Sequence, residues 1–188
     1  RELFPLRIDE ELSLTLLQLE DAEPIFALVT HSREELRQWL PWVDASRSTK
    51  DTEAFLTMVQ EQHTKNNGFQ CAIRVHGEVV GVIGLHGFNR SNCSASIGYW
   101  LGTSFSGHGY MTRACKAILR VLFEELETNR VEIRAAVDNT RSRAIPERLG
   151  FSQEGIARQS ERNREEFLDL VVYSLLAQEW RSKVHEQT

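Results

Sequence analysis

The chain has 188 residues and a formal net charge of −5, with 41% hydrophobic and 26% charged residues. This length suits one domain with its own core, and the composition is that of an ordinary soluble globular protein. The negative charge argues against a nucleic-acid partner, which would need a basic face. No apolar run approaches the roughly 20 residues of a membrane span and no signal peptide is present, so we expect a cytoplasmic protein with no membrane partner.

Two further features concern the setting of the chain. It begins at Arg1 rather than at methionine, so we expect a processed N-terminus or a place within a longer protein. Cys71, Cys93 and Cys115 are odd in number, far apart and outside any metal-ligand spacing. We therefore expect reduced, mostly buried thiols and no bound metal.

The predicted elements mix hairpins with strand–helix–strand units. In chain order they are a strand over 12–19, a helix after Asp21, a short helix over 32–40, a loop over 41–50, a helix from Asp51 or Thr52 that stops before Gly68, a hairpin of 69–75 and 79–85, a strand over 95–101, a long helix to about Leu126, a strand over 131–137, a short helix over 141–149, and a final hairpin of 151–161 and 166–176. This order predicts an α+β or mixed-sheet α/β domain.

The most informative stretch is the Gly-rich turn within Ser104–Cys115, which follows one predicted strand and opens the long helix. The apolar residues of that helix recur at helical spacing, at Met111, Ala114, Cys115, Ile118, Leu122 and Leu126. The start of a helix presents unpaired backbone N–H groups at the positive end of its dipole. Because Gly107 and Gly109 allow close approach to the backbone, the turn predicts a phosphate or pyrophosphate site.

The turn has two other interpretations. A dinucleotide fingerprint would use Asp138 as the acid after the next strand, but Thr112 replaces its third glycine and antiparallel strands precede the unit. A plain turn that only starts a helix explains the glycines equally well. The pattern alone leaves the phosphate site and the plain turn open.

Further motifs decide between these interpretations. They are Ile97-Gly98-Tyr99-Trp100, Ser106-Gly107-His108-Gly109-Tyr110-Met111-Thr112, Asn139-Thr140-Arg141-Ser142-Arg143-Ala144 and Leu149-Gly150-Phe151. In these residues, and more weakly as far back as Trp39-Leu40-Pro41-Trp42, the chain resembles the GNAT family of acyl-CoA-dependent N-acetyltransferases, in particular its RimJ/RimL branch. The motifs occur in the family's order and spacing, and the resemblance covers nearly the whole chain.

The resemblance implies a single domain over residues 1–188, with a mixed, largely antiparallel central sheet flanked by helices and a splayed strand pair. It implies acetyl-CoA as cosubstrate, with its pyrophosphate in the turn and its pantetheine arm along the preceding strand. The implied cofactor-binding residues are Ile97, Tyr99, Ser106, Gly107, His108, Gly109, Tyr110, Met111, Thr112, Asn139 and Ser142. Ser106 replaces the family's Gln or Arg, and Met111 replaces a small residue. We expect coenzyme A to bind despite both changes, because backbone N–H groups make most of the contacts with its pyrophosphate.

The reaction needs a neutral amine, a stabilised oxyanion and an exit for the thiolate. A free α-amine has a pKa near 8, so a modest base suffices, whereas a lysine amine near 10.4 is harder to deprotonate. The resemblance assigns the base to Glu161, a proton donor for the thiolate to Ser142, and the oxyanion to a backbone N–H near Tyr99. By spacing alone, Glu161 is equally a cross-strand partner of nearby arginines, and Ser142 a helix cap.

Other side chains leave further mechanisms open. Cys93 and Cys115 are candidate nucleophiles for a covalent acyl-enzyme intermediate. Cys115, however, lies on the apolar face of its helix, a position typical of a core residue. His86 and His108 are alternative bases, and the position of His108 within the turn favours contact with coenzyme A or solvent. We expect direct transfer in a ternary complex.

The acceptor is expected to meet aromatic side chains from the N-terminal part of the chain. The pattern indicates core positions for Trp39 and Phe55, and an exposed loop position for Trp42. A resemblance to the microcin C self-immunity acetyltransferases implies that Trp42 and Phe55 stack on the base of an aminoacyl-nucleotide antibiotic. We favour this small-molecule acceptor, and hence detoxification. The alternatives are the N-terminal α-amine of a ribosomal protein and a non-catalytic acyl-CoA-binding module.

Overall fold

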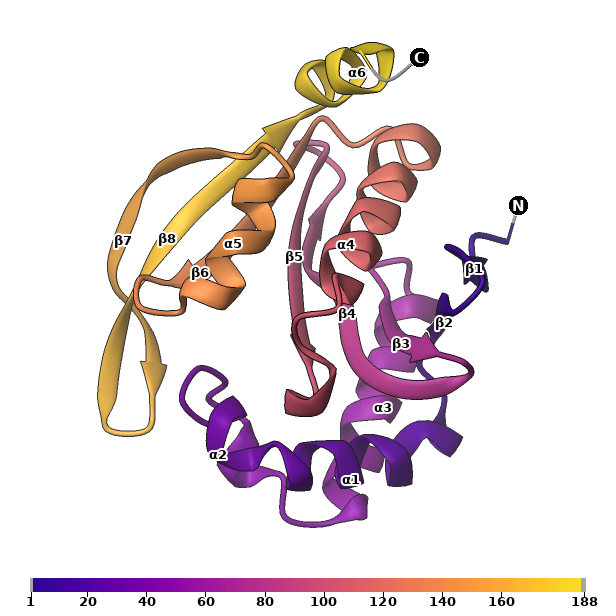
Figure 1. Cartoon of the computed structure of the whole chain (residues 1–188), viewed down its shortest axis with the longest axis vertical. Coiled ribbons are helices and arrows are strands. Elements are labelled where there is room, and N and C mark those ends of the chain that lie inside the picture. The colour runs from indigo at the N-terminus through magenta and orange to yellow at the C-terminus, as the bar shows by residue number, and fades with distance from the viewer. Residues whose placement is uncertain (1, 187–188) are drawn as a thin grey trace.

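A computed structural model describes residues 2–186 and centres on an eight-stranded sheet of order β1-β2-β3-β4-β5-β6-β8-β7 (Figure 1). The strands are β1 (Leu6–Arg7), β2 (Leu12–Leu16), β3 (Gln70–Val75), β4 (Glu78–Asn89), β5 (Ser94–Leu101), β6 (Arg130–Ala136), β7 (Ser152–Asn163) and β8 (Glu166–Leu176). The helices are α1 (Ala22–His31), α2 (Arg33–Leu36), α3 (Thr49–Thr64), α4 (Tyr110–Arg120), α5 (Thr140–Arg148) and α6 (Ala177–Glu186). Short 3-10 turns are η1 (Leu19–Asp21), η2 (Val43–Ala45) and η3 (Thr103–Phe105), and η4 (Val121–Glu125) is a π turn.

The strand pairing confirms the predicted mixed sheet. Neighbouring strands pair antiparallel everywhere except at β5 and β6, which are parallel and joined through α4. The parallel register covers only Ser94–Ile97 against Arg130–Ile133, although β5 continues to Leu101 and β6 to Ala136. The two strands therefore diverge beyond this register, as the predicted splayed pair requires.

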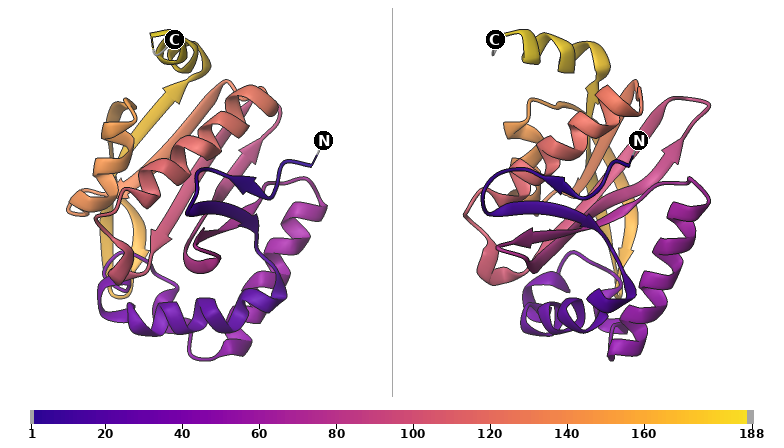
Figure 2. Two further views of the ribbon diagram at one scale, coloured as in Figure 1. Left: turned by 45° about the vertical axis from the view of Figure 1, so that its right-hand side comes forward. Right: turned by 90° about the vertical axis from the view of Figure 1, so that its right-hand side faces the viewer.

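Helices cover both faces of the sheet (Figure 2). The alternation of side chains along each strand sends Ile97 and Ile133 toward α4, whose buried apolar stripe includes Ala114 and Ile118. On the opposite face α1 and α3 form a second core against β3 and β4, with members Ile25, Val29, Leu56, Val59, Ala72 and Val82. No helix in the described part of the chain is both long and apolar enough to cross a membrane.

The start of α3 differs from the prediction. It begins at Thr49 rather than at Asp51 or Thr52, because Ser48 is the N-cap and Asp51 occupies the third helical position of a capping box. The Asp51 carboxylate accepts from the backbone N–H of Ser48 at 3.0 Å and of Arg47 at 2.9 Å. Asp51 thus supports a helix end that lies before it.

Other differences concern the short and terminal elements. The helix predicted over 32–40 is only α2, and β1 and α6 were not predicted. α6 is mostly polar, but Trp180 anchors it: the indole lies 5.6 Å from the Phe123 ring and its Nε1 donates to Glu124 at 3.0 Å. The predicted long helix ends in the π turn η4, whose wider turn buries Val121, Leu122 and Phe123 in succession.

Two glycines of β4 give a matched test of this packing. A Cβ at Gly81 would lie 2.3 Å from the Trp100 carbonyl oxygen in β5, whereas a Cβ at Gly87 would meet nothing within 4 Å. We expect Gly81→Ala to cost about 2 kcal/mol, or roughly 4–8 °C in Tm by thermal unfolding. Gly87→Ala should change Tm much less, and equal Tm values for the two variants would contradict the described β4–β5 packing.

Candidate active site

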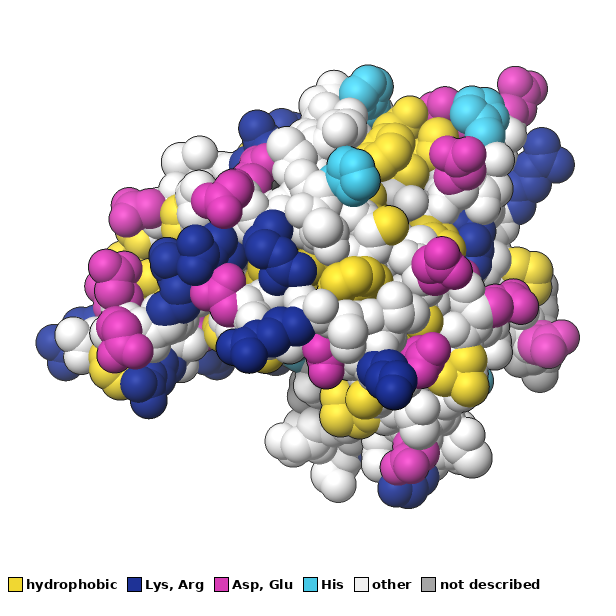
Figure 3. All heavy atoms as spheres, turned by 90° about the horizontal axis from the view of Figure 1, so that it is seen from below, with side chains coloured by type: hydrophobic (Ala, Val, Ile, Leu, Met, Phe, Trp, Pro, Cys, Tyr) yellow, Lys and Arg dark blue, Asp and Glu magenta, His cyan; other side chains and the backbone are white. Residues whose placement is uncertain are grey.

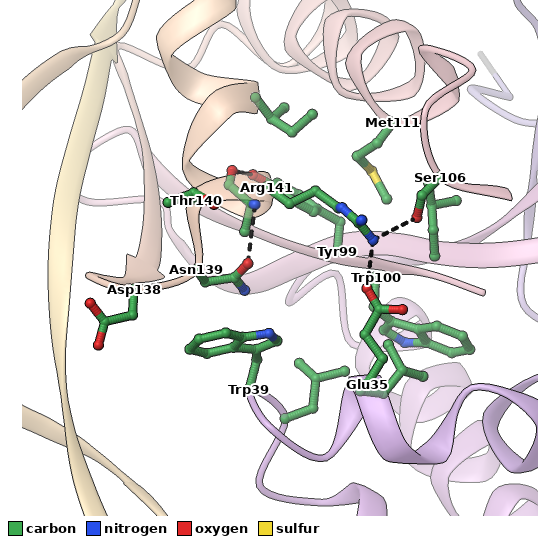
Figure 4. Close-up of a pocket in the computed structure, with 15 residues that line it drawn as sticks. Glu35, Trp39, Tyr99, Trp100, Ser106, Met111, Asp138, Asn139, Thr140 and Arg141 are labelled. Carbon is green, nitrogen blue, oxygen red and sulfur yellow. Dashed lines mark hydrogen bonds and ion pairs between the residues drawn. The ribbon is translucent and has the colours of Figure 1, made fainter. Parts of the chain in front are cut away.

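A cavity of about 300 Å³ opens where β5 and β6 diverge (Figure 4). Its walls come from α2 and the loop after it, the end of β5, the Gly-rich turn and the first turn of α5. Trp39 and Trp100 lie on one side of the cavity, and Asn139, the N-cap of α5, lies opposite Trp39; Ser142 of α5 also lines the cavity. Segments far apart in the sequence thus meet at one opening in the sheet.

The Gly-rich turn lies at one end of this cavity. Gly107 and Gly109 have φ angles of +83° and +74°, in the left-handed region that favours glycine, and both are exposed. Within the described part of the chain, the backbone N–H groups of residues 107–112 donate no hydrogen bond. They stand at the N-terminus of α4, so the turn offers partially positive donors to an anion.

A set of side chains holds this turn in place. Arg113 forms ion pairs with Asp9 and with Glu11 at 3.1 Å, and its Nη2 donates to the His108 carbonyl at 3.4 Å. The His108 ring stacks on Tyr110 with centroids 5.2 Å apart. Because the charge of Arg113 is already paired with Asp9 and Glu11, we assign Arg113 the role of holding the turn in place.

The opposite wall is held by one hydrogen bond between strand and helix. The Tyr99 hydroxyl of β5 donates to the Ser142 carbonyl at 2.9 Å, and Asn139 caps α5 by accepting from the Ser142 N–H at 3.2 Å. Burial raises the pKa of Tyr99 well above its usual range, so the hydroxyl remains a donor. The Ser142 hydroxyl has no hydrogen bond within residues 2–186 and is free to meet a ligand.

Glu161 lies half-buried on β7, beyond an irregular stretch of the β7–β8 pairing between Ala157 and Glu161. It forms no ion pair within the described residues, so the interpretation as a cross-strand partner of arginine is wrong. Burial raises the pKa of its carboxyl, which favours a group that takes up a proton readily. Glu161 itself is not part of the cavity wall.

The tip of the β7–β8 hairpin lies against the segment after α2, as Figure 1 also shows. The Asn163 side-chain amide donates to the carbonyls of Gln38 at 2.7 Å and Arg37 at 3.3 Å. Arg37 in turn holds Asp44 through two contacts of 3.0 Å. Figure 3 shows the surface of the molecule seen from below relative to Figure 1. Basic side chains gather toward the left side of this surface, with acidic and apolar side chains among them.

Several sequence-predicted residues come together at the cavity. Its lining includes Tyr99, Ser106, Met111, Asn139 and Ser142. The other turn residues, Gly107, His108, Gly109, Tyr110 and Thr112, adjoin it without lining it, and Ile97 is buried in the core where the parallel pairing ends.

The predicted acceptor aromatics lie elsewhere. Trp42 is 42% exposed, as expected, and its ring lies 5.8 Å from that of Trp100 at 56°. Phe55 is 37% exposed on α3, so its interpretation as core is wrong, and neither residue lines the cavity. Trp39 lines the cavity and is not a core residue. Trp100 also lines the cavity, a role that its place in the Ile97–Trp100 motif did not predict.

The cysteines do not support a covalent intermediate. Cys115 is fully buried in the core, and burial raises the pKa of its thiol to about 12. Cys93 is exposed just before β5, at the opposite end of that strand from the cavity. Among residues 2–186 no group of His, Cys, Asp and Glu side chains is arranged to hold a metal ion.

Comparisons with known proteins agree with this geometry. A model of the Acetyltransferase (GNAT) domain family matches residues 11–152. The Bacillus subtilis protein YdaF, classed with the ribosomal N-acetyltransferases, is 38% identical over 96% of this chain and 100% of its own length.

Two solved structures resemble the fold closely. RimL, the ribosomal L7/L12 α-N-protein acetyltransferase in complex with coenzyme A, superposes with a TM-score of 0.89 at 25% identity, covering 92% of this chain and 98% of RimL. The microcin C7 self-immunity acetyltransferase MccE, in complex with acetyl-CoA and AMP, superposes with a TM-score of 0.86 at 25% identity. The superposition covers 90% of this chain and 94% of the MccE chain.

The Tyr99–Ser142 hydrogen bond can be tested by removing one hydroxyl. Tyr99→Phe leaves the Ser142 carbonyl without its donor, so we expect the free energy of unfolding in urea to fall by about 1 kcal/mol. Tyr110→Phe is the control, because the Tyr110 hydroxyl has no hydrogen bond within the described residues. An unchanged urea midpoint for Tyr99→Phe would contradict the proposed anchoring of α5.

Proposed function

Because the chain belongs to the acetyltransferase (GNAT) family and is an N-acetyltransferase, we propose that it transfers acetyl from acetyl-CoA to a free α-amine. The observation that carries this proposal is the meeting of an anion-binding turn with an aromatic-walled cavity where β5 and β6 diverge. The turn would hold the nucleotide end of the cosubstrate, and the cavity would receive the amine.

The cosubstrate is acetyl-CoA, and the chain fits its parts. The unpaired N–H groups of residues 107–112 suit a diphosphate, and the open space beside Gly107 and Gly109 admits it to the backbone. The pantetheine arm carries amide groups, which can pair with the free edge of β5 beyond Ile97 as an added strand would. Of the proposed cofactor-binding residues, five line the cavity: Tyr99, Ser106, Met111, Asn139 and Ser142.

The chain's own side chains supply the remaining chemistry. The amine nitrogen attacks the thioester carbonyl carbon, a C–N bond forms, and the carbonyl oxygen becomes negative. A backbone N–H of β5 near Tyr99 would stabilise that oxyanion. Glu161 would take the proton lost by the amine, and the Ser142 hydroxyl would protonate the thiolate as the C–S bond breaks. The half-buried position of Glu161 and the unpaired hydroxyl of Ser142 support these roles.

We place the N-terminal α-amine of a ribosomal protein first among acceptors. RimL acts on such an amine, and YdaF is classed with ribosomal N-acetyltransferases. The preference derived from the sequence is thereby reversed, because the expected base-stacking pair, Trp42 and Phe55, does not line the cavity. A cytoplasmic location belongs to the same proposal.

An aminoacyl-nucleotide acceptor, and with it antibiotic self-immunity, is the second candidate. The observation in its favour is the pair of indole rings, Trp39 and Trp100, on one side of the cavity. Aromatic faces can stack on a nucleobase, and the MccE structure contains AMP. Both acceptors present an α-amine, so the proposed chemistry is common to them.

The acceptor class can be tested by thiol release from acetyl-CoA. We expect release with a ribosomal N-terminal peptide that has a free α-amine and an internal lysine, and mass spectrometry should find acetyl on the α-amine alone. The same peptide with a blocked α-amine should be inert. Acetyl on lysine would contradict the proposal. Faster release with an aminoacyl-adenylate analogue, lost in Trp39→Ala and kept in Trp42→Ala, would favour the second candidate.

The role of Glu161 can be tested through the pH dependence of the rate. A general base must be ionised, and the pKa of Glu161 is raised, so kcat/KM should increase with pH through a limb above the usual glutamate range. Glu161→Gln should lower kcat about a hundredfold and remove this limb, with the Kd of coenzyme A unchanged. Glu165→Gln, in the exposed turn of the same hairpin, is the control. Full activity of the Glu161→Gln variant would exclude Glu161 as the general base.

A further inference from the structure

One ion pair spans the mouth of the cavity between its two sides (Figure 4). Nη1 of Arg141, on α5, lies 2.5 Å from Oε1 of Glu35, on α2. The same nitrogen lies 3.3 Å from the Ser106 hydroxyl, at the start of the Gly-rich turn. Arg141 therefore connects the acceptor side of the cavity with the proposed diphosphate site.

Two guanidinium groups reach side chains of the Gly-rich turn: Arg141 contacts the Ser106 hydroxyl, and Arg148 donates to the Thr112 hydroxyl at 3.3 Å. Arg113 is held by Asp9 and Glu11, and Arg143 donates to Tyr173 and to the Val137 carbonyl. The Arg141 and Glu35 side chains are 67% and 37% exposed. An ion pair so exposed to solvent contributes little stability, so a stronger anion can replace the carboxylate.

We propose that Arg141 is a cofactor-binding residue that exchanges Glu35 for the diphosphate of coenzyme A. This inference rests on the proposed placement of the diphosphate at residues 106–112. A diphosphate carries more charge than a carboxylate and accepts paired hydrogen bonds from a guanidinium. Glu35 is thus a competitor for Arg141, and cofactor binding releases α2 from α5.

The exchange has a consequence for the order of binding. α2 leads directly into Trp39 on the acceptor side of the cavity, so the Glu35–Arg141 ion pair ties that side to α5 while the cofactor is absent. Once the diphosphate takes Arg141, this link is broken. Because such coupling is reciprocal, an acceptor should bind better to the chain loaded with coenzyme A than to the free chain.

The test measures binding by isothermal titration calorimetry on the full chain without an acceptor. The probes are coenzyme A, dephospho-coenzyme A, which keeps the diphosphate, and pantetheine, which lacks it. Arg141→Met should raise the Kd of the first two probes equally, by about tenfold, and leave that of pantetheine unchanged. An effect confined to coenzyme A would assign Arg141 to the 3′-phosphate and overturn the proposal.

The competition itself is tested at Glu35. Glu35→Gln should lower the Kd of coenzyme A about two- to fivefold, and this gain should vanish in the Arg141→Met background. Glu34→Gln, next to it on α2, and Arg120→Met, at the far end of α4, are the charge controls. An unchanged Kd for Glu35→Gln, or an equal change in Glu34→Gln, would overturn the exchange.

These outcomes are separate from those that bear on the acceptor. Binding of coenzyme A with no dependence on Arg141 would remove this inference and leave the proposed α-amine transfer intact. Failure of the unmodified chain to bind coenzyme A at all would remove both.

Discussion

The site depends on the divergence of β5 and β6 beyond Ile97 and Ile133. Each strand keeps its other neighbour, since β5 stays paired with β4 as far as Leu101 and β6 with β8 as far as Ala136. Only the facing edges lose their partners. The sheet therefore stays intact while one stretch of backbone is left free for a ligand, and the Tyr99–Ser142 hydrogen bond links β5 to α5 at this gap.

Two different kinds of interaction operate on either side of this gap. On the proposed cofactor side the donors are backbone N–H groups at the start of α4, which do not depend on the identity of the side chains. On the proposed acceptor side the cavity wall comes from side chains of α2 and the following loop, and the Asn163 amide ties the β7–β8 hairpin to that loop. This side therefore depends on contacts between side chains from distant segments.

The same contrast explains what the sequence predicts well. The strand–turn–helix unit is local: Gly107 and Gly109 need positive φ angles, and the apolar spacing from Met111 onward specifies the buried face of α4. The mixed sheet and the splayed pair were correctly expected, the latter from the family resemblance. The start of α3 was misplaced because a capping aspartate can stand inside the helix it supports.

The acceptor side could not be predicted because it is made by contacts between distant segments. Trp39 has the spacing of a core residue, yet it lines the cavity beside Trp100 of β5. Glu35 and Arg141 are 106 positions apart and meet only in the fold. Glu161, in contrast, was assigned from the family resemblance, and its half-buried, unpaired state is a property that spacing cannot show.

The most direct test of this account is hydrogen–deuterium exchange of the whole chain with and without coenzyme A. If the cofactor binds to the free edge of β5 and to the start of α4, amides at residues 98–101 and 107–112 should exchange more slowly in its presence. Protection confined to another part of the chain, such as the small hollow lined by Phe88 and Arg130, would contradict the account.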